Sequence, residues 1–293
     1  MKLTFDPVSA DRQHDYRQYL KKFAWKASDY SFINLRGWGK EYGLQWAWTD
    51  ELVWIRQTEP ETAYWAPAGA WQKQDWSALL PRYFPPGTVF NRVPEELLKI
   101  WKETLGEKIT YEAREEHWDY LYSVEELIQL RGNRFHKKKN LFRQFCRKYA
   151  YEYVPLESKL IRQALDMQED WCIWRDCESA EVLAAENRAI ARVLEDWDEL
   201  ENIMGGALYV NGEMAAFTVA EETDSQTLLI HFEKGLPDYK GIYQAINRMF
   251  LEDNAHYSIV NREQDLGEPG LRKAKKSYNP TDYVRKYRVC LQR

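Results

Sequence analysis

The sequence predicts an α+β protein of two domains, each with a mixed, mostly antiparallel sheet flanked by helices. Its 293 residues exceed one ordinary small domain, and a hydrophobic share of 44% is enough for sizeable cores. Segments with helical periodicity alternate with short aromatic and β-branched runs that are typical of strands. The links between successive strand-like runs are short, as between antiparallel neighbours. We place the domains at residues 1–115 and 116–293.

The composition excludes several classes of protein. The net charge of −5 gives no general attraction to nucleic acid or acidic lipid, so such binding must come from local basic patches. The amino terminus has no apolar signal core, and no run approaches the roughly 18 apolar residues of a transmembrane segment. The four cysteines form no CxxC or Cys/His pattern. We expect free thiols in a reducing compartment, no metal site, no bound cofactor and a soluble cytoplasmic protein.

The first half alternates helices and strands. Helices are predicted over residues 9–22, 28–35, 75–83 and 94–105, with Ser28 or Asp29 as the cap of the second. Strands are predicted at residues 43–48, 52–57, 63–67 and 89–93. Residues 111–122 are expected to form a mixed connection at the domain boundary.

The second half begins with helices and continues with a meander. Residues 124–150 form a charged stretch with a bend at Gly132 and helical spacing from Leu141, and helices are predicted over residues 159–174, 179–197 and 242–253. Strands are predicted at residues 205–210, 213–221, 227–234, 257–260 and 283–291, and Asn211-Gly212 is a strong hairpin signal. Pro269 suits the first position of a short helix that Asn279-Pro280 ends.

A basic segment lies between residues 132 and 149. Its apolar residues fall at helical spacing from Leu141 to Tyr149, so this face belongs to the core. The rest of its surface carries bases, among them Arg134, Lys137 and Lys138. Two interpretations stay open. The segment is either an ordinary amphipathic helix with a basic exterior or a surface that binds the phosphates of nucleic acid, lipid or pyrophosphate.

Residues 261–280 combine acids, glycines and bases in a turn and one short helix. Arg272 and Lys275 are three apart on that helix and share a face, and a helix start followed by clustered bases is a natural anion site. Glu263 and Asp265 are two apart, so on extended chain they point the same way and can hold an amine or accept a proton. The alternative is a solvated charged helix with internal ion pairs.

The order of elements in the second half resembles the Gcn5-related N-acyltransferase fold. In that fold the loop after the fourth strand and the helix behind it bind the acyl donor's pyrophosphate. Here the loop contains Lys240 and Gly241, and Tyr243 stands where the coenzyme A motif has its second glycine. The coenzyme A motif also begins with Gln or Arg, where this chain has Asp238.

Four motifs resemble a narrower family, the C-terminal catalytic domain of phosphatidylglycerol lysyltransferases and its stand-alone relatives. They are GNRFHKKKNL at 132–141, KGIYQAIN at 240–247, NREQDLG at 261–267 and GLRKAKKSYNP at 270–280. The resemblance implies two tandem acyltransferase-like domains. It also implies transfer of an amino acid from an aminoacyl-tRNA ester to a phospholipid or small-molecule acceptor.

Such a transfer needs a stabilised oxyanion and a proton acceptor. We expect Asp265 and Glu263 to be the base or the ligands of an amine, with Glu233 as the alternative base. Binding of phosphate or of the oxyanion is expected from Arg272, Lys275, Lys240, Gly241, Arg134, Lys137, Lys138 and Tyr278.

Two other functions stay open. One is an N-acetyltransferase that depends on acyl-coenzyme A, which fits the fold. The other is a non-catalytic protein that binds tRNA, lipid or another anion. The presence of Glu263 and Asp265 beside the bases argues against the second, because unpaired acids weaken an anion site.

Overall fold

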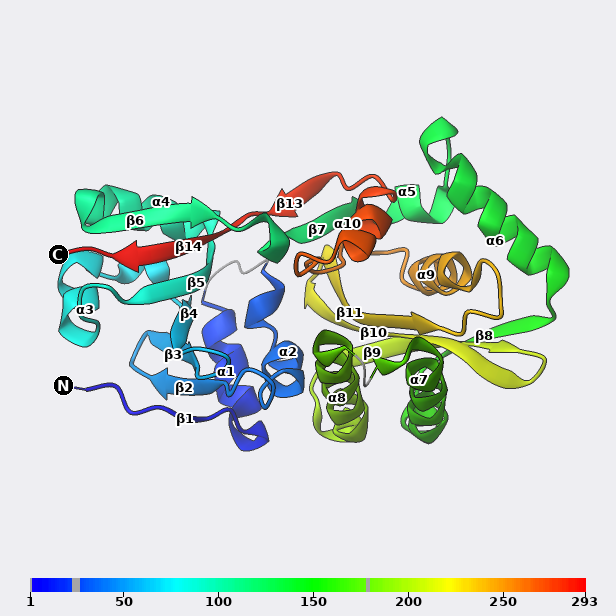
Figure 1. Ribbon diagram of the computed structural model, residues 1–293, viewed down its shortest axis with the longest axis horizontal. Helices are drawn as coiled ribbons and strands as arrows, with labels where there is room; N and C mark the ends of the chain where they lie inside the picture. Colours follow the sequence, from blue (N-terminus) through cyan, green and yellow to red (C-terminus); the bar gives the residue numbers. More distant parts are fainter. Residues whose placement is uncertain (1, 23–26, 178–179) are drawn as a thin grey trace. The chain divides into compact units, whose positions relative to one another are not determined.

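The computed structural model describes residues 2–22, 27–177 and 180–293 (Figure 1). The chain divides into two compact units, each assembled from segments that are distant in the sequence. The first unit consists of Met1–Asp119, Gln264–Glu268 and Tyr283–Arg293, and the second of Tyr120–Glu263 and Pro269–Asp282. Each has its own seven-stranded sheet.

The sheet of the first unit has the order β1-β2-β3-β4-β5-β14-β6. β4 and β5 are parallel, and the other neighbours are antiparallel. The strands are β1 (Asp6–Pro7), β2 (Gln45–Trp48), β3 (Leu52–Gln57), β4 (Ala63–Gly69), β5 (Val89–Pro94), β6 (Ile109–Ala113) and β14 (Lys286–Leu291). The helices are α1 (Gln13–Leu20), α2 (Phe32–Gly37), α3 (Trp76–Tyr83) and α4 (Glu95–Leu105).

Aromatic side chains fill the core of the first unit. Trp54, Trp76 and Trp101 are fully buried and contact one another edge to face, with ring centroids 6.3 and 5.4 Å apart. Phe90 of β5 packs on Trp101 at 5.1 Å. Such pairs stabilise the fold by more than the area they bury. They attach α3 and α4 to the sheet.

The sheet of the second unit has the order β13-β7-β12-β11-β10-β9-β8. Its strands are β7 (Asp119–Ser123), β8 (Tyr151–Pro155), β9 (Ile203–Val210), β10 (Glu213–Asp224), β11 (Thr227–Gly235), β12 (Ile259–Asn261) and β13 (Asp282–Val284). The helices are α5 (Val124–Gln129), α6 (His136–Lys148), α7 (Ile161–Arg175), α8 (Glu181–Glu195), α9 (Ile242–Asp253) and α10 (Pro269–Lys276). α9 lies on one face of the sheet, and α7 and α8 lie on the other (Figure 1).

β11 and β12 are parallel over only three residue pairs, from Thr227↔Ile259 to Leu229↔Asn261. β11 then continues to Gly235 beyond this pairing. The strand order around this point, three antiparallel strands, a helix and a parallel strand, occurs in both units. The fold is therefore α+β, with tandem domains of the Gcn5-related N-acyltransferase type. The divergence of β11 from β12 positions the candidate site.

Most predicted elements are present, with several differences. The expected connection at residues 111–122 contains parts of β6 and β7, and β8 was not predicted. The cap of α2 is Ser31, which accepts the Asn34 N–H at 3.3 Å, because Ser28 is instead hydrogen-bonded to buried Asp119. The start predicted for α8 at residue 179 lies outside the described residues.

The last strand is also different from the prediction. Residues 283–291 were expected to form one strand that closes the second half, but they divide into β13 and β14, and β14 lies between β5 and β6. Lys286 at its start is fully buried, and its ammonium is 2.7 Å from Asp119 Oδ1 and also pairs with Asp29. Alternation along a strand fixes its buried face but not the sheet that it joins.

Candidate functional site

Arg262 follows β12 directly, at the point where β11 has separated from it. Its Nη2 donates to Glu233 Oε1 on β11 at 2.9 Å, and Asn247 of α9 donates to Glu233 Oε2 at 2.9 Å. The guanidinium lies 4.9 Å from the ring centroid of Tyr278. Arg262 Nη1 is buried, and no described residue gives it a hydrogen-bond partner. The cation is therefore held firmly by Glu233 but only partly satisfied.

Lys138 of α6 places a second cation against the same ring. Its Nζ lies 3.9 Å from the Tyr278 centroid, and no described carboxylate is within ion-pair distance of it. Burial, and after it the charge of Arg262, lower the pKa of Lys138 to about 8, and Glu233 opposes both. The Tyr278 hydroxyl accepts from Gln244 Nε2 at 3.0 Å. We call Lys138, Glu233, Asn247, Arg262 and Tyr278 the Arg262 cluster.

A second cluster lies on the same strand. The buried imidazole of His231 is flanked by two carboxylates, with Nδ1 2.8 Å from Glu263 Oε1 and Nε2 3.3 Å from Glu221 Oε1. Burial alone lowers the pKa of His231, but Glu221 and Glu263 raise it to about 9. At neutral pH the ring is an imidazolium, which fixes the position of Glu263. The side chain of Glu263 keeps 13% of its surface exposed.

The turn after β12 separates the two carboxylates that the sequence suggested would act together. Glu263 has a φ of 56°, so the chain is not extended there and the argument from alternation does not apply. Asp265 is completely buried in the first unit, where its Oδ1 accepts the Gly267 N–H at 2.9 Å. This bond shapes a turn. The role of Asp265 as a base stays a prediction.

The bases of α10 have different roles. The ammonium of Lys275 donates to the backbone carbonyls of Arg262 and Glu263, so it holds the turn in place. Arg272 is half-buried on the same helix. Arg134, expected to bind phosphate, forms an ion pair with Glu126. Of the predicted binding residues, Lys138 and Tyr278 are in the Arg262 cluster.

Lys240 and Gly241 lie at the start of α9, against α6. Gly241 has a φ of +92°, and a Cβ there would be 2.4 Å from the backbone oxygen of Leu141. The backbone N–H of Lys240 donates to the Tyr149 hydroxyl at 3.3 Å. Lys240 lines a pocket of about 330 Å³ together with Gln144, Arg147 and Lys148. α6 thus covers the loop that binds pyrophosphate in other proteins of this fold.

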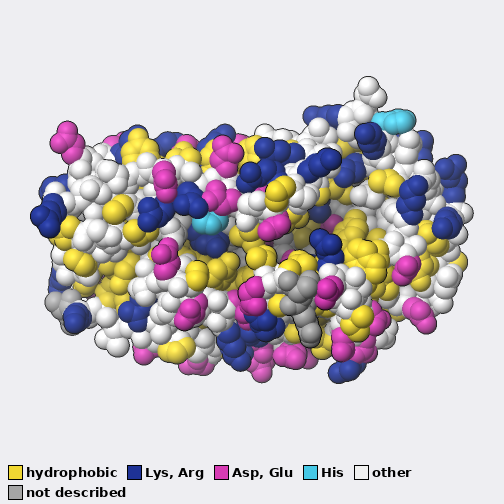
Figure 2. Space-filling model, in the orientation of Figure 1, with side chains coloured by type: hydrophobic (Ala, Val, Ile, Leu, Met, Phe, Trp, Pro, Cys, Tyr) yellow, Lys and Arg dark blue, Asp and Glu magenta, His cyan; other side chains and the backbone are white. Residues whose placement is uncertain are grey.

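The exposed side of α6 is strongly basic. The helix contains six Lys and Arg residues and no Asp or Glu. Lys137, Arg143, Arg147 and Lys148 are exposed, while Phe145 is buried against α9, β9 and β10. In Figure 2 dark blue side chains gather over this helix. We call these four exposed bases the α6 basic face.

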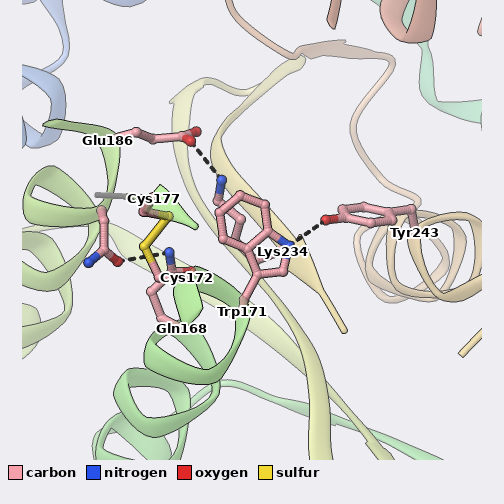
Figure 3. The surroundings of a disulfide bond; sticks show 8 residues. Gln168, Trp171, Cys172, Cys177, Glu186, Lys234 and Tyr243 are labelled. Atoms are coloured by element: carbon pink, nitrogen blue, oxygen red, sulfur yellow. Dashed lines mark hydrogen bonds and ion pairs between the residues drawn. A yellow bond between two sulfur atoms is a disulfide. The ribbon is translucent and has the colours of Figure 1, made fainter. Parts of the chain in front are cut away.

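On the opposite face of β11, Lys234 forms a third charged group (Figure 3). Its ammonium pairs with Glu186 of α8 at 2.7 Å and lies 3.9 Å from the Trp171 ring, whose Nε1 donates to the Tyr243 hydroxyl at 3.0 Å. These contacts join α7, α8 and α9 around the end of β11.

The cysteine next to Trp171 corrects an expectation. Cys172 and Cys177 were expected to be free thiols, but they form a disulfide with their Cα atoms 5.2 Å apart (Figure 3). The left-handed residue Asp176, at the end of α7, turns the chain back and brings the two together. Cys146 and Cys290 are free.

Neither a metal site nor a membrane span is found among the described residues. Over the described part of the chain, no group of three or more His, Cys, Asp or Glu side chains is arranged to hold a metal ion. Within the same residues, no helix is both long enough and apolar enough to cross a bilayer.

Sequence reasoning did not assign Arg262, His231 or Asn247 to the site. A signal for Arg262 was present. Asn261-Arg262 at the end of β12 repeats Asn91-Arg92 of β5, and in each the asparagine is the last residue of the parallel pairing and the arginine follows it. For His231 no local motif marks the two carboxylates, because Glu221 and Glu263 belong to other segments.

Comparisons with known proteins identify the family of this chain. Residues 21–290 match the family model described as phosphatidylglycerol lysyltransferase, C-terminal. An uncharacterized protein of Mycoplasmoides gallisepticum is 22% identical over 200 residues. That match spans 67% of this chain but 63% of the relative, which is less than two thirds of its length.

Two solved structures are similar over nearly the whole chain. A conserved protein of unknown function from Bacteroides thetaiotaomicron is 29% identical, with a TM-score of 0.89 and coverage of 99% of this chain and 100% of that one. The structure of L-PGS from Bacillus licheniformis is 11% identical, with a TM-score of 0.65 and coverage of 98% and 93%. The second similarity concerns the fold alone.

Proposed function

Because this chain belongs to the family of C-terminal domains of phosphatidylglycerol lysyltransferases, we propose that it is an aminoacyltransferase. It moves an aminoacyl group from aminoacyl-tRNA to a hydroxyl or amine acceptor, such as a phospholipid. The reaction takes place at the divergence of β11 and β12, between the Arg262 cluster and Glu263.

The observation that carries the proposal is the position of α6. This helix packs on the loop before α9, so Leu141 and Tyr149 occupy the surroundings in which the fold otherwise binds the pyrophosphate of coenzyme A. On its outer side it presents the α6 basic face, although the whole chain has a net charge of −5. A local basic surface on an acidic protein suits a polyanionic donor, because each Lys or Arg displaces counterions from a phosphate backbone.

Each residue has a separate role in the transfer reaction. The acceptor oxygen or nitrogen attacks the ester carbonyl carbon, and a new C–O or C–N bond forms while the C–O bond to the ribose breaks. Glu263, held by the His231 imidazolium, accepts the acceptor's proton and returns it to the leaving ribose oxygen. Arg262 stabilises the developing oxyanion through the positive charge of its guanidinium. No other reactant is required.

The test is a transfer assay with two donors. Total tRNA charged with labelled amino acids, and separately labelled acetyl-coenzyme A, are incubated with the protein and with phosphatidylglycerol vesicles or small amines and alcohols. We expect transfer from tRNA. Glu263→Gln should lower it at least ~100-fold when assayed well below the melting temperature of the variant, which should itself fall because the ion pair with His231 is lost. Glu268→Gln, the same change at an exposed position of the same loop, should have no effect.

Each other outcome rejects a specific part of the proposal. Transfer from acetyl-coenzyme A alone would make the protein an N-acetyltransferase. Binding of tRNA without transfer to any acceptor would make it a non-catalytic RNA-binding protein. Full activity in Glu263→Gln would remove Glu263 from the mechanism.

A further inference from the structure

We propose that Lys138 and Arg262 form a binding site for a single phosphodiester, the one next to the aminoacylated ribose of the donor. This subsite rests on the proposed function for the identity of its ligand. Its existence as an anion site depends only on the geometry of the Arg262 cluster.

The cluster has an excess of positive charge. Lys138 and Arg262 contribute two cations, and Glu233 is the one carboxylate that either contacts within the described residues, so the sum is one positive charge. Both cations lie against the Tyr278 ring, at 3.9 and 4.9 Å. Two like charges at one partly buried site repel each other, and one bound monoanion removes that repulsion. A phosphodiester carries one negative charge.

The hydrogen-bond donors of the cluster are also incompletely used. Both oxygens of Glu233 are occupied, one by Arg262 Nη2 and the other by Asn247 Nδ2. Arg262 Nη1 is buried without a partner among the described residues, and Lys138 Nζ has only the Tyr278 ring. The side chain of Arg262 as a whole is 14% exposed, although Nη1 itself is buried. A cationic donor that is buried and unsatisfied is costly unless a ligand completes it.

The identity of the anion follows from the helix that supplies Lys138. Lys138 is on α6 directly after Lys137 of the α6 basic face, so one helix carries both the exposed bases and the inner cation. When the phosphates of the donor bind along the exposed bases of α6, the last phosphodiester before the aminoacylated ribose lies at Lys138. The ester to be cleaved is one ribose away from that group, and the proposed base Glu263 is adjacent to Arg262 in the chain.

The probe is the dinucleotide CpA, which has one phosphodiester and the 3′-terminal sequence of tRNA. Binding is measured by NMR titration at low ionic strength, where screening is weakest. Lys138→Met should weaken binding about tenfold or more, because a charge-assisted contact is lost. Lys139→Met removes the same charge from the next residue of α6 and should change affinity less than about twofold.

The pH dependence gives a second readout. Lys138 is charged below its pKa of about 8, so wild-type affinity should fall as the pH rises from 7 to 9. Lys138→Arg should keep its affinity over this range, because arginine stays protonated. The groups that face Lys138 are Arg262, Glu233 and Tyr278, and burial raises the Tyr278 pKa to about 12, so the phenol stays neutral. His231, with a pKa of about 9, titrates equally in both proteins.

Three results would overturn the assignment. If Lys138→Met binds CpA as tightly as the wild type does, Lys138 is not part of the subsite. The same conclusion follows if the affinity of Lys138→Arg falls with pH as much as that of the wild type. Glycerophosphoglycerol, the headgroup of the lipid without its chains, is the competing probe. If glycerophosphoglycerol binds in a way that depends on Lys138 and CpA does not bind, the subsite belongs to the acceptor and not to the donor.

The subsite and the proposed function fail separately. Lys138-dependent CpA binding by a protein that transfers nothing would reject the aminoacyltransferase and keep the subsite. Transfer from tRNA that does not depend on Lys138 would reject the subsite and keep the aminoacyltransferase.

Discussion

The two units have an Asn-Arg pair at the same place in the fold but surround it differently. Asn91 ends the parallel pairing of β5 with β4, Asn261 ends that of β12 with β11, and each arginine is the next residue. Both arginines contact aromatic rings, Arg92 that of Trp65 at 4.5 Å and Arg262 that of Tyr278 at 4.9 Å. The difference between the units is the charge around each arginine.

In the first unit the charges balance. Arg92 pairs with Asp29 at 2.5 Å, and Lys286 pairs with both Asp29 and Asp119, so two cations meet two carboxylates. All four side chains are almost completely buried. In the second unit α6 adds Lys138, and over the described residues the first unit has no equivalent of this helix. A balanced buried cluster can only stabilise its unit, whereas one with an excess charge can also bind a ligand.

The largest expected effect comes from breaking the balanced cluster. Arg92→Met leaves Asp29 with one cation and should lower the free energy of unfolding by about 3–5 kcal/mol, because a buried charge loses its partner. Lys138→Met, which breaks no ion pair, should change it by less than about 1 kcal/mol. Urea denaturation followed by tryptophan fluorescence measures both. Equal losses would show that the two clusters have the same role.

A smaller effect should appear as a pH dependence that belongs to the second unit. His231 has its pKa raised to about 9 from 6.5, so its contribution to stability is complete below pH 6.5 and is lost as the pH rises through 9. We expect the free energy of unfolding to fall by about 2 kcal/mol between pH 6.5 and 8, although Lys138, with a pKa of about 8, begins to titrate in this window and offsets a small part of the fall. His231→Gln should abolish that decrease. A wild-type curve that is flat or rising in this window would contradict the imidazolium assignment.

The smallest expected effect tests how tightly α6 packs against the loop before α9. Gly132 and Gly241 both have positive φ, but a Cβ on Gly132 meets nothing within 4 Å, whereas one on Gly241 meets the Leu141 oxygen. Gly132→Ala should therefore cost about 1 kcal/mol for backbone strain, and Gly241→Ala about 1 kcal/mol more for the contact with α6. Thermal denaturation of the pair measures the difference. Equal costs would indicate that α6 moves away without loss.

Much of the fold could be predicted because its signals are local. Hydrophobic periodicity located α8 and α9, and Asn211-Gly212 located the hairpin between β9 and β10. The placement of β14 in the first sheet could not be predicted, because Val289 and Leu291 would be buried equally well in either sheet. The Cys172–Cys177 bond was missed because spacing alone does not show that α7 ends in a turn between them.

The site was predicted in part for the same reason. Lys138 and Glu233 were recognised because each has a clear local context, a basic helix and a strand end. Arg262 lies within the NREQDLG motif, but the sequence does not indicate its role. Its partner Glu233 is 29 positions earlier, and the two meet only because β11 extends beyond β12. Two residues that meet only in the tertiary structure have no fixed spacing in the sequence by which they could be recognised.

The insertion of β14 between β5 and β6 has a consequence for synthesis of the protein on the ribosome. β6 ends at Ala113 and β14 begins at Lys286, so translation between them takes roughly ten to thirty seconds at ordinary rates. During this time β5 and β6 lack their shared neighbour, and Asp119 lacks the ammonium of Lys286. Unpaired strand edges attract other chains. The part of the protein that is synthesised first is therefore among the last to finish folding, and its strand edges stay open to other chains during that interval.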